Sequence, residues 1–295
     1  MKILDFGSLN IDDIYALPHF VRPGETIAST GYAQNAGGKG FNQGVALRKA
    51  GCAVSFGGAI GRDGRFLVDY MNELGVDTGC IEELDVPTGH AIIQVDEAGG
   101  NCIILFGGAN RCISDALIDR ALAPMDPGDY VLLQNEINAP ERLIEKAYAK
   151  GLNVVLNPSP AAPEMKDWPL DKVSLFILNE VEGGDLTGET DPEAILDALL
   201  ARFPNARIVL TLGEQGSVYA DATQRVRQAA FRADAVDTTA AGDTFTGYFL
   251  SAVLEGKDVP YALKLASLAS SITVSRPGAA KSIPMLDEVL ARMEG

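Results

Sequence analysis

Residues 237–244, with the sequence DTTAAGDT, combine carboxylates with small residues at the expected start of a helix. The first turn of a helix carries unpaired backbone N–H groups and a partial positive charge, so it binds anions well. Asp243 lies beside those groups and could accept a proton while the amides hold a phosphate. Phosphoryl transfer to a hydroxyl needs both features. An acidic first turn that only stabilises a buried helix explains the segment about equally well.

A second glycine-rich segment, residues 37–44 with the sequence GGKGFNQG, precedes an expected helix. Its glycines let the backbone approach a ligand closely, and Lys39 and Asn42 offer donors to hydroxyls or phosphate. The spacing is not that of a Walker A loop, because Lys39 is followed by glycine and not by Ser or Thr. A flexible turn is the alternative explanation.

Polar side chains follow two of the expected strands. Asn10 and Asp12 come after the strand at Ile3–Phe6, and Glu136 follows the strand at Tyr130–Leu133. Open α/β sheets bind ligands at the carboxyl ends of their strands, and a carboxylate such as Asp12 can accept hydrogen bonds from a vicinal diol. Local turns and ordinary acidic strand ends are the competing explanations.

Two later strand ends could face a nucleotide. Asn179 and Glu182 follow the strand at Leu175–Leu178, where Asn179 could bond a phosphate oxygen and Glu182 could bind Mg²⁺ directly or through water. A capped helix with an acidic first turn is the alternative for this pair. Thr211 and Gly213 end the next strand, where the backbone could approach a nucleotide or form a plain turn.

The composition bounds the class of protein. The 295 residues are 47% hydrophobic, and 40 acidic against 24 basic residues give a net charge of -16. Because no cluster of Lys and Arg stands out and no apolar run approaches ~18 residues, we expect neither nucleic acid nor a membrane as partner. The four cysteines form no C-x-x-C pair, so free thiols fit better than a zinc site. The chain begins directly as a strand, and we expect a cytoplasmic protein.

Alternating strand and helix patterns must position these residues. Short apolar runs predict strands at Ile3–Phe6, Val54–Phe56, Tyr130–Leu133, Val154–Leu156, Leu175–Leu178 and Ile208–Leu212. Helical patterns lie between them at Gly40–Lys49, Arg65–Leu74, Ser114–Leu122, Pro140–Ala149 and Pro192–Phe203. Three helices follow at Ala241–Leu254, Pro260–Val274 and Met285–Met293. This order predicts βαβ units and a mostly parallel sheet covered by helices on both faces.

Two segments break the alternation. Residues 12–32 read as extended chain, and Gly89–Val95 and Asn101–Phe106 are alternating β runs joined by a hairpin signal. We expect them to form a small accessory β layer that serves as a lid or a dimer surface. The whole chain, 1–295, is expected to form a single domain, with lid strands inserted at about 12–34 and 88–107.

The order of these signals resembles the ribokinase-like (PfkB) family of carbohydrate kinases, essentially from end to end. The sequence is closest to the ribokinase branch, with supporting segments at 87–89, 108–110, 156–161 and 276–279. The resemblance implies a three-layer α/β/α ribokinase-like fold with a mostly parallel central sheet and a small β-sheet lid that pairs two subunits into a homodimer. It implies a phosphotransferase with an alcohol group as acceptor, which phosphorylates a sugar from ATP. D-ribose, a pentose phosphorylated at its primary (5-) hydroxyl, is the leading substrate.

The resemblance also assigns roles to residues, with Asp243 as the general base. Besides Asp243, the sugar would be held by Asn10, Asp12, Gly38, Lys39, Asn42 and Glu136. ATP would be contacted by Asn179, Thr211 and Gly213, and the transferring phosphate by the amides of Ala240, Ala241 and Gly242. Glu182 would help to organise Mg²⁺. A monovalent cation, normally K⁺, would be bound by Asp237, Thr239, Thr273, Arg276, Gly278 and Ser282, several through backbone carbonyls.

The sequence departs from the family pattern in the lid. His90 stands where an aliphatic residue is more usual, and the run Asn101–Phe106 is bulky, so the sugar could differ. We expect His90 to pack within the lid and not to catalyse. A kinase for another sugar or a nucleoside, and a non-catalytic sugar-binding regulator on the same fold, remain alternatives. A nicotinamide oxidoreductase fits less well, because no G-x-G-x-x-G follows the first strand.

Overall fold

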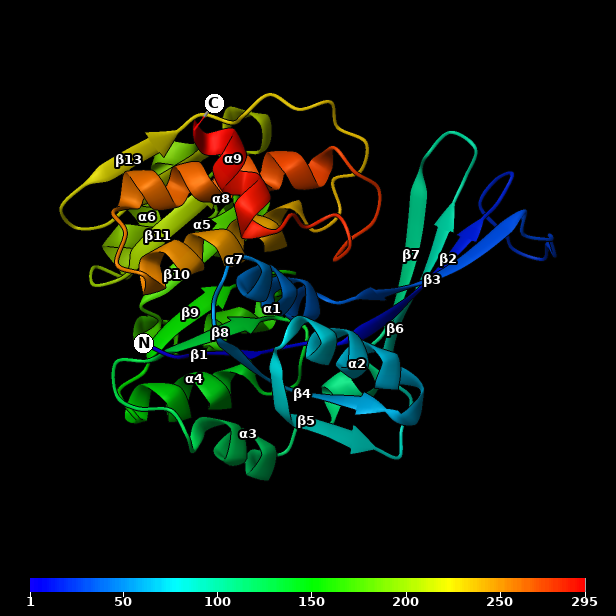
Figure 1. Cartoon of the computed structure of the whole chain (residues 1–295), viewed down its shortest axis with the longest axis horizontal. Coiled ribbons are helices and arrows are strands. Elements are labelled where there is room, and N and C mark those ends of the chain that lie inside the picture. The colour runs from blue at the N-terminus through cyan, green and yellow to red at the C-terminus, as the bar shows by residue number, and fades with distance from the viewer. Residues whose placement is uncertain (295) are drawn as a thin grey trace.

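The computed structural model describes residues 1–294 and contains two separate β-sheets (Figure 1). The larger sheet has nine strands, in the spatial order β13 (Arg225–Gln228), β12 (Ser217–Ala220), β11 (Arg207–Thr211), β10 (Leu175–Asn179), β9 (Asn153–Asn157), β8 (Tyr130–Gln134), β1 (Ile3–Phe6), β4 (Val54–Gly61) and β5 (Asp77–Leu84). From β11 to β5 all neighbouring strands run parallel, whereas β12 pairs antiparallel with both β11 and β13. The predicted mostly parallel sheet is confirmed.

Helices cover both faces of this sheet and form the outer two of three layers. One face carries α1 (Lys39–Lys49), α2 (Arg65–Leu74), α7 (Ala241–Leu254), α8 (Val259–Val274) and α9 (Leu286–Glu294). The other carries α3 (Asp115–Leu122), α4 (Pro140–Ala149), α5 (Glu180–Thr187) and α6 (Pro192–Arg202). Ile3 of β1 packs into the first core and Leu4 into the second, because successive side chains of a strand point to opposite faces.

Local sequence signals set several helix ends. Ser114 caps α3 by accepting a hydrogen bond from the N–H of Leu117 at 3.1 Å, and Asp191 caps α6 in the same way. Ser and Asp are among the residues preferred at this position of a helix. The sequence does not predict strands β5 and β13, because neither has a fully buried residue and so neither carries the apolar run on which the prediction rests. Strand β12, four residues long and fully buried, is not predicted either.

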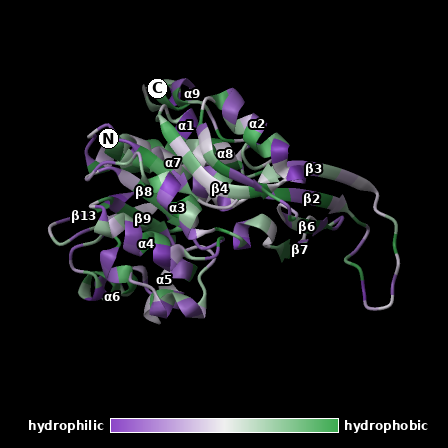
Figure 2. Ribbon diagram, turned by 90° about the horizontal axis from the view of Figure 1, so that it is seen from below, coloured by the Kyte–Doolittle hydropathy of each residue, from purple (hydrophilic) through white to green (hydrophobic). Residues whose placement is uncertain are grey.

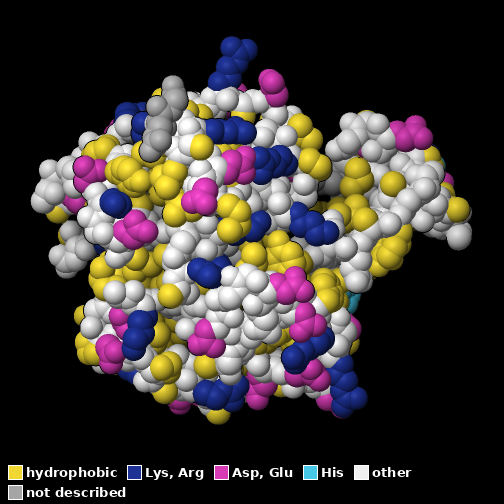
Figure 3. All heavy atoms as spheres, in the orientation of Figure 1, with side chains coloured by type: hydrophobic (Ala, Val, Ile, Leu, Met, Phe, Trp, Pro, Cys, Tyr) yellow, Lys and Arg dark blue, Asp and Glu magenta, His cyan; other side chains and the backbone are white. Residues whose placement is uncertain are grey.

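The smaller sheet projects sideways from the layered body (Figure 2). Its strand order is β3 (Gly31–Gly37), β2 (Asn10–Ala16), β6 (Gly89–Val95) and β7 (Asn101–Phe106). The predicted hairpin is β6–β7, and β6 also runs parallel to β2, a pairing that the sequence does not reveal. We call this sheet the lid. In the space-filling view a notch separates the lid from the body (Figure 3).

Among the helices formed by residues 1–294, none is both long and apolar enough to cross a membrane.

Candidate active site

A cavity of about 210 Å³ lies at the carboxyl ends of β9, β10 and β11, against the first turn of α7. The predicted site residues that line it are Lys39, Asn179, Glu182, Thr211, Ala240, Ala241, Gly242 and Asp243. Asn157, Ser159, Thr238 and Thr246 line it too, and the sequence assigned no role to them. Gly213, in the turn after β11, is not part of the lining. Parallel strands that end together thus gather residues from distant parts of the chain.

The first turn of α7 presents free amide groups to this cavity. Ala240 precedes the helix in the left-handed conformation, with φ of 62°, which costs a non-glycine residue about 1–2 kcal/mol. The N–H of Ala241 donates to the carbonyl of Thr238 at 3.2 Å. Within residues 1–294, the N–H groups of Gly242 and Asp243 have no protein acceptor. A Cβ added to Gly242 would meet no atom within 4 Å, so this residue leaves open space in front of the amides.

The carboxylate of Asp243 is buried and held by two consecutive side chains of α1. Asn42 Nδ2 donates to Asp243 Oδ2 at 3.1 Å, and Gln43 Nε2 donates to Oδ1 at 2.8 Å. Lys39 begins the same helix. Burial alone lowers the pKa of Lys39, but the charges of Asp243, Glu136 and Glu182 outweigh it and raise that pKa overall. Lys39 therefore keeps its positive charge near the three carboxylates of Asp243, Glu136 and Glu182.

The predicted sugar-binding residues gather where the lid joins the body. Glu136 follows β8, and its Oε2 accepts hydrogen bonds from the N–H of Lys39, at 2.9 Å, and from the hydroxyl of Ser8. Asn10, in the first position of β2, accepts a hydrogen bond from Asn110 Nδ2 at 2.7 Å. The amide of Lys39 follows Gly38, whose φ is 95°. These contacts join the base of the lid to the start of α1, and so to Asp243.

Asp12 lies on β2, two residues after Asn10. A Cβ on Gly37 of the neighbouring strand would lie 2.0 Å from Asp12 Oδ2, so the carboxylate of Asp12 would have to move if any other residue stood there. Burial, then the nearby charges of Glu136 and Asp13, raise the pKa of Asp12 to about 7. Register pairing puts Asp12 opposite Ala91 and Ala91 opposite Leu105, so all three share one face of the lid.

His90 lies one residue before Ala91 on β6 and faces the opposite side of the lid. Its Nδ1 is 3.1 Å from the carbonyl oxygen of Thr88, and its ring centroid is 5.0 Å from that of Phe106. The side chain therefore packs within the lid, as the sequence suggested.

Comparison with known proteins identifies the class of this site. A family profile for pfkB family carbohydrate kinases matches residues 2–286. The chain belongs to the PfkB family of carbohydrate kinases. This PfkB kinase is 34% identical over 297 residues to a ribokinase from Haemophilus influenzae, covering 98% of this chain and 97% of the relative. The predicted enzyme class, a phosphotransferase with an alcohol group as acceptor, is confirmed.

Solved ribokinase structures share the fold of the PfkB kinase over its whole length. The ribokinase from Cryptococcus neoformans in complex with ADP is 34% identical, with a TM-score of 0.88 and 99% of both chains covered. The Arabidopsis thaliana ribokinase complexed with ribose and ATP is 29% identical, with a TM-score of 0.88 and coverage of 100% and 99%. The predicted ribokinase-like α/β fold is confirmed, and ATP use is expected for an enzyme of this family.

In this PfkB kinase, Asn179 and Glu182 form a capping box at the start of α5. Asn179 Oδ1 accepts a hydrogen bond from the N–H of Glu182 at 2.9 Å, and Glu182 Oε2 accepts one from the N–H of Asn179 at 3.0 Å. The capping explanation of this pair is therefore correct. Both residues also line the cavity, so the cap fixes the carboxylate of Glu182 at the edge of that cavity.

The predicted ligands of the monovalent cation lie on two segments of the PfkB kinase that are in direct contact. Asp237 Oδ2 accepts a hydrogen bond from the N–H of Gly278 at 2.9 Å, and Oδ1 accepts from Thr239. Within residues 1–294, the carbonyl oxygens of Arg276 and Gly278 accept no hydrogen bond. A carboxylate beside unpaired carbonyl oxygens suits a hard cation such as K⁺. The hydroxyls of Thr273 and Ser282 are already engaged, with Thr244 and with the carbonyl of Ala279.

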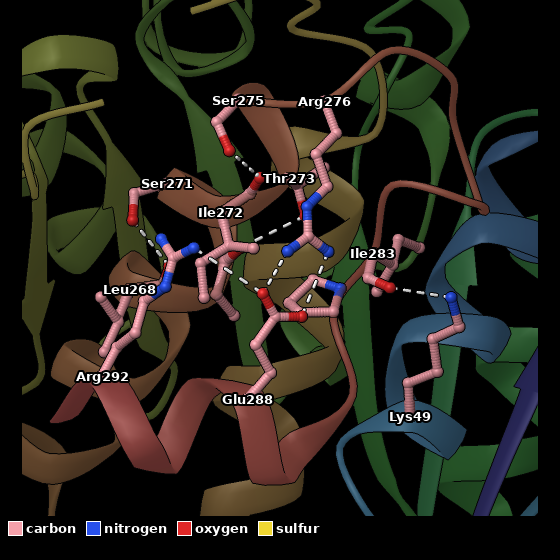
Figure 4. A network of polar contacts seen from close by, with 12 residues as sticks. Lys49, Leu268, Ser271, Ile272, Thr273, Ser275, Arg276, Ile283, Glu288 and Arg292 are labelled. Carbon is pink, nitrogen blue, oxygen red and sulfur yellow. Dashed lines mark hydrogen bonds and ion pairs between the residues drawn. The ribbon is translucent and has the colours of Figure 1, made fainter. Parts of the chain in front are cut away.

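Two side chains with no predicted role hold the segment 276–284, which we call the cation loop (Figure 4). Lys49 Nζ, on α1, donates to the carbonyls of Ala280 at 3.0 Å and Ile283 at 2.8 Å. Glu288, on α9, binds the guanidinium of Arg276 through both carboxylate oxygens. Burial, reinforced by Arg276, lowers the pKa of Lys49 to about 8. The only sequence signal for Lys49 is a basic residue in the last turn of an otherwise buried helix.

Proposed function

We propose that this PfkB kinase transfers the γ-phosphate of MgATP to the 5-hydroxyl of D-ribose, with Asp243 as the general base. The observation that carries the proposal is the position of Asp243. Its carboxylate is tied to α1 through Asn42 and Gln43, and its own N–H belongs to the free amides at the start of α7. A group in that place can accept the proton of a hydroxyl while the amides receive the negative charge of the phosphate.

The sugar side of the reaction is assigned to the base of the lid. Asn10, Asp12, Gly38, Lys39, Asn42 and Glu136 would hold the sugar together with Asp243. Ionised carboxylates such as Asp12 accept hydrogen bonds from two neighbouring hydroxyls, and Lys39 offers donors from its ammonium group. Leu105, on the same face of the lid as Asp12, would cover the sugar and exclude water that would otherwise hydrolyse ATP. The ribose and ATP named for the Arabidopsis relative support this choice of substrates.

The nucleotide side is assigned to the cavity. Asn179, Thr211 and Gly213 would contact ATP, and the amides of Gly242 and its neighbours Ala240 and Ala241 would bind the transferring phosphate. Because the N–H of Ala241 is bonded to Thr238, that bond must open before Ala241 can contribute. Glu182 would hold Mg²⁺ through water, since the side chain already accepts bonds from Asn179. The metal would neutralise charge on the phosphates.

We further propose a K⁺ site between Asp237 and the cation loop, and a homodimer formed through the lid. Asp237, Thr239, Thr273, Arg276, Gly278 and Ser282 would bind K⁺, mostly through carbonyl oxygens. For the dimer, the support is β7, an edge strand in which every residue is exposed and four consecutive residues, Ile103–Phe106, are apolar. An exposed apolar edge strand of this kind needs a partner.

The test is ADP release from MgATP with D-ribose, 2-deoxyribose, fructose, ketodeoxygluconate and nucleosides, each in K⁺ and in Na⁺. Turnover on ribose that depends on K⁺ is the expected result. Turnover on another sugar or a nucleoside would keep the kinase chemistry and correct the substrate. No ADP release with any acceptor would favour a sugar-binding regulator on the same fold.

A further inference from the structure

Asp5 is an acidic residue in β1, an interior strand of the large sheet, and it is fully buried on the face that carries α1 and α7. Its Oδ1 accepts a hydrogen bond from Gln134 Nε2 at 3.0 Å, while Oδ2 has no hydrogen-bond partner within residues 1–294. Burial raises the pKa of Asp5 well above its ordinary value, the bond from Gln134 opposes this, and the charge of Asp243 adds to it. A position that would suit an apolar side chain therefore carries a costly carboxyl group.

Hydrogen bonds join Asp5 to Asp243 through two buried amide side chains. Gln134 Nε2 donates both to Asp5 Oδ1 and to Gln43 Oε1, the latter at 2.8 Å. Gln43 Nε2 in turn donates to Asp243 Oδ1 at 2.8 Å and to Asn157 Oδ1 at 3.2 Å. Asp5, Gln43 and Gln134 have no exposed surface, and Asp243 is 7% exposed. Four segments of the chain, from β1, α1, β8 and α7, meet in this row.

The direction of each bond in the row matters, because an amide has a donor end and an acceptor end. Gln43 can direct its donor end at Asp243 only while its oxygen faces Gln134. Gln134, in turn, can offer its nitrogen to Gln43 because both of its N–H bonds find acceptors, one on Gln43 and the other on Asp5. If the side-chain amide of Gln134 flipped, the amide of Gln43 would be free to flip as well. The Oε1 of Gln43 would then face the Asp243 carboxylate in place of its N–H group.

We propose that Asp5 is a positioning residue for the reaction: through Gln134 it fixes the amide of Gln43 so that an N–H group, and not an oxygen, meets Asp243. This rests on the proposed role of Asp243 as the base. The acceptor oxygen of Asp5 is what the role requires, and the second oxygen contributes nothing to the row. An asparagine at position 5 can therefore take over the function, whereas a leucine of similar size cannot.

The test compares Asp5→Leu with the matched control Asp5→Asn, using the pH dependence of kcat, the KM for ribose and the melting temperature. In Asp5→Leu we expect kcat to fall about tenfold to hundredfold, the scale of one hydrogen bond to a charged group. The acidic limb of the pH–rate profile should move to higher pH, since an oxygen facing Asp243 disfavours its ionised form. KM should change little, and Asp5→Asn should keep the wild-type profile.

The titratable groups that interact electrostatically with Asp243 include Lys39 from α1 and Asp5 itself from β1. Gln134→Met therefore provides a second test, because it breaks the row without changing any charge, and it also covers the case in which Asp5→Leu does not fold. It should move the same limb of the profile in the same direction.

Three results would overturn the proposal. One is a wild-type profile in Asp5→Leu or in Gln134→Met. Another is an equal loss in Asp5→Asn and Asp5→Leu, which would mean that the acceptor oxygen is not what matters. The last is a lower melting temperature with kcat and KM impaired together and no shift of the limb, as for a purely structural residue. Asp243→Asn is measured alongside: if it stays active, the proposed base is wrong whatever position 5 does.

Discussion

Asn42 Nδ2 lies 3.1 Å from Asp243 Oδ2, and this hydrogen bond joins the first turn of α1 to the first turn of α7. The two residues are 201 positions apart in the sequence. Lys39 begins the same helix as Asn42, so this hydrogen bond connects the residues assigned to the sugar with the residue assigned to proton transfer. Substitutions on the α1 side should therefore affect sugar binding first, and substitutions on the α7 side should affect the chemical step first.

Replacing Asp243 by asparagine should remove the proton acceptor while keeping the shape of the side chain and one acceptor oxygen. We expect kcat to fall by ~10²–10⁴, the usual contribution of a general base. The dissociation constant for ribose, measured by calorimetry, should change much less. A loss of affinity with kcat intact would assign Asp243 to binding instead.

Gly242→Ala should separate stability from activity. No atom lies within 4 Å of the added Cβ, and alanine is favoured over glycine in a helix by about 1 kcal/mol, so the melting temperature should stay equal or rise. The new methyl group would fill the space in front of the free amides, and phosphoryl transfer should fall sharply. Gly256→Ala, at a glycine with φ of 75° far from the cavity, is a contrasting control that should lower stability and leave kcat unchanged.

Asp12 should make ribose binding depend on pH. With a pKa of about 7, its carboxyl is mostly ionised at pH 8 and mostly protonated at pH 6. Since only the ionised form accepts two hydroxyl bonds, the dissociation constant should rise ~10-fold from pH 8 to pH 6. Asp12→Asn should bind weakly at both pH values.

The same shift has a consequence for stability. The pKa of Asp12 is raised on folding, so the folded state binds this proton more tightly than the unfolded state does. Ionisation of Asp12 therefore costs stability as the pH rises from about 4 to 7. Asp12→Asn should melt at a higher temperature than the wild type at pH 8, and this difference should shrink at pH 4. An unchanged melting temperature at pH 8 would contradict the raised pKa.

Lys49→Met should loosen the cation loop, because two buried carbonyls lose their donor. K⁺ should raise the melting temperature above its value in Na⁺. The K⁺ concentration that gives half of this rise should be higher in Lys49→Met than in the wild type. Lys49→Arg, which keeps the charge and several donors, should respond more like the wild type. If both variants keep the wild-type K⁺ response, the loop does not depend on position 49.

A charge in the exposed strand of the lid should prevent pairing of two chains. Ile104 is 56% exposed on β7, and Ile104→Glu should yield a monomer in light scattering after size-exclusion chromatography. Tyr148→Glu is the matched control, since Tyr148 is 55% exposed on α4, within the body. A wild-type monomer, or a dimer that survives the Ile104 substitution, would exclude the lid as the interface.

Much of the fold could be predicted because its elements carry local signals. The limits of α2, α4 and α7 agree with the sequence patterns, and the β6–β7 hairpin does so at both ends. What failed has a physical reason. The strands of the lid pair through residues far apart in the chain, and the parallel contact of β2 with β6 has no local signature. Strand β5 consists only of exposed and half-buried residues and offers no apolar run.

The candidate site divides in the same way. Its glycine-containing segments, and Asp243 within one of them, stand out because phosphate chemistry constrains neighbouring residues. The row of hydrogen bonds from Asp5 to Asp243 does not stand out in the sequence, because Gln43 and Gln134 are ordinary polar residues until the fold brings them together. Asp5, an acidic residue inside an apolar strand, is a signal that the sequence analysis does not use, because its role depends on two partners, Gln134 and Gln43, that no spacing rule connects to it.

The position of β1 affects how the chain can fold during its synthesis. This strand precedes both of its neighbours, β4 and β8, in the chain, so its backbone stays at least half unpaired until residue 134 has left the ribosome. Helix α7 emerges more than a hundred residues later still. A nascent chain therefore carries the whole lid and all of the residues assigned to the sugar, apart from Asp243, long before it carries the base. A truncated product that ends before α7 would therefore lack the group proposed for proton transfer and could not use ATP by this route.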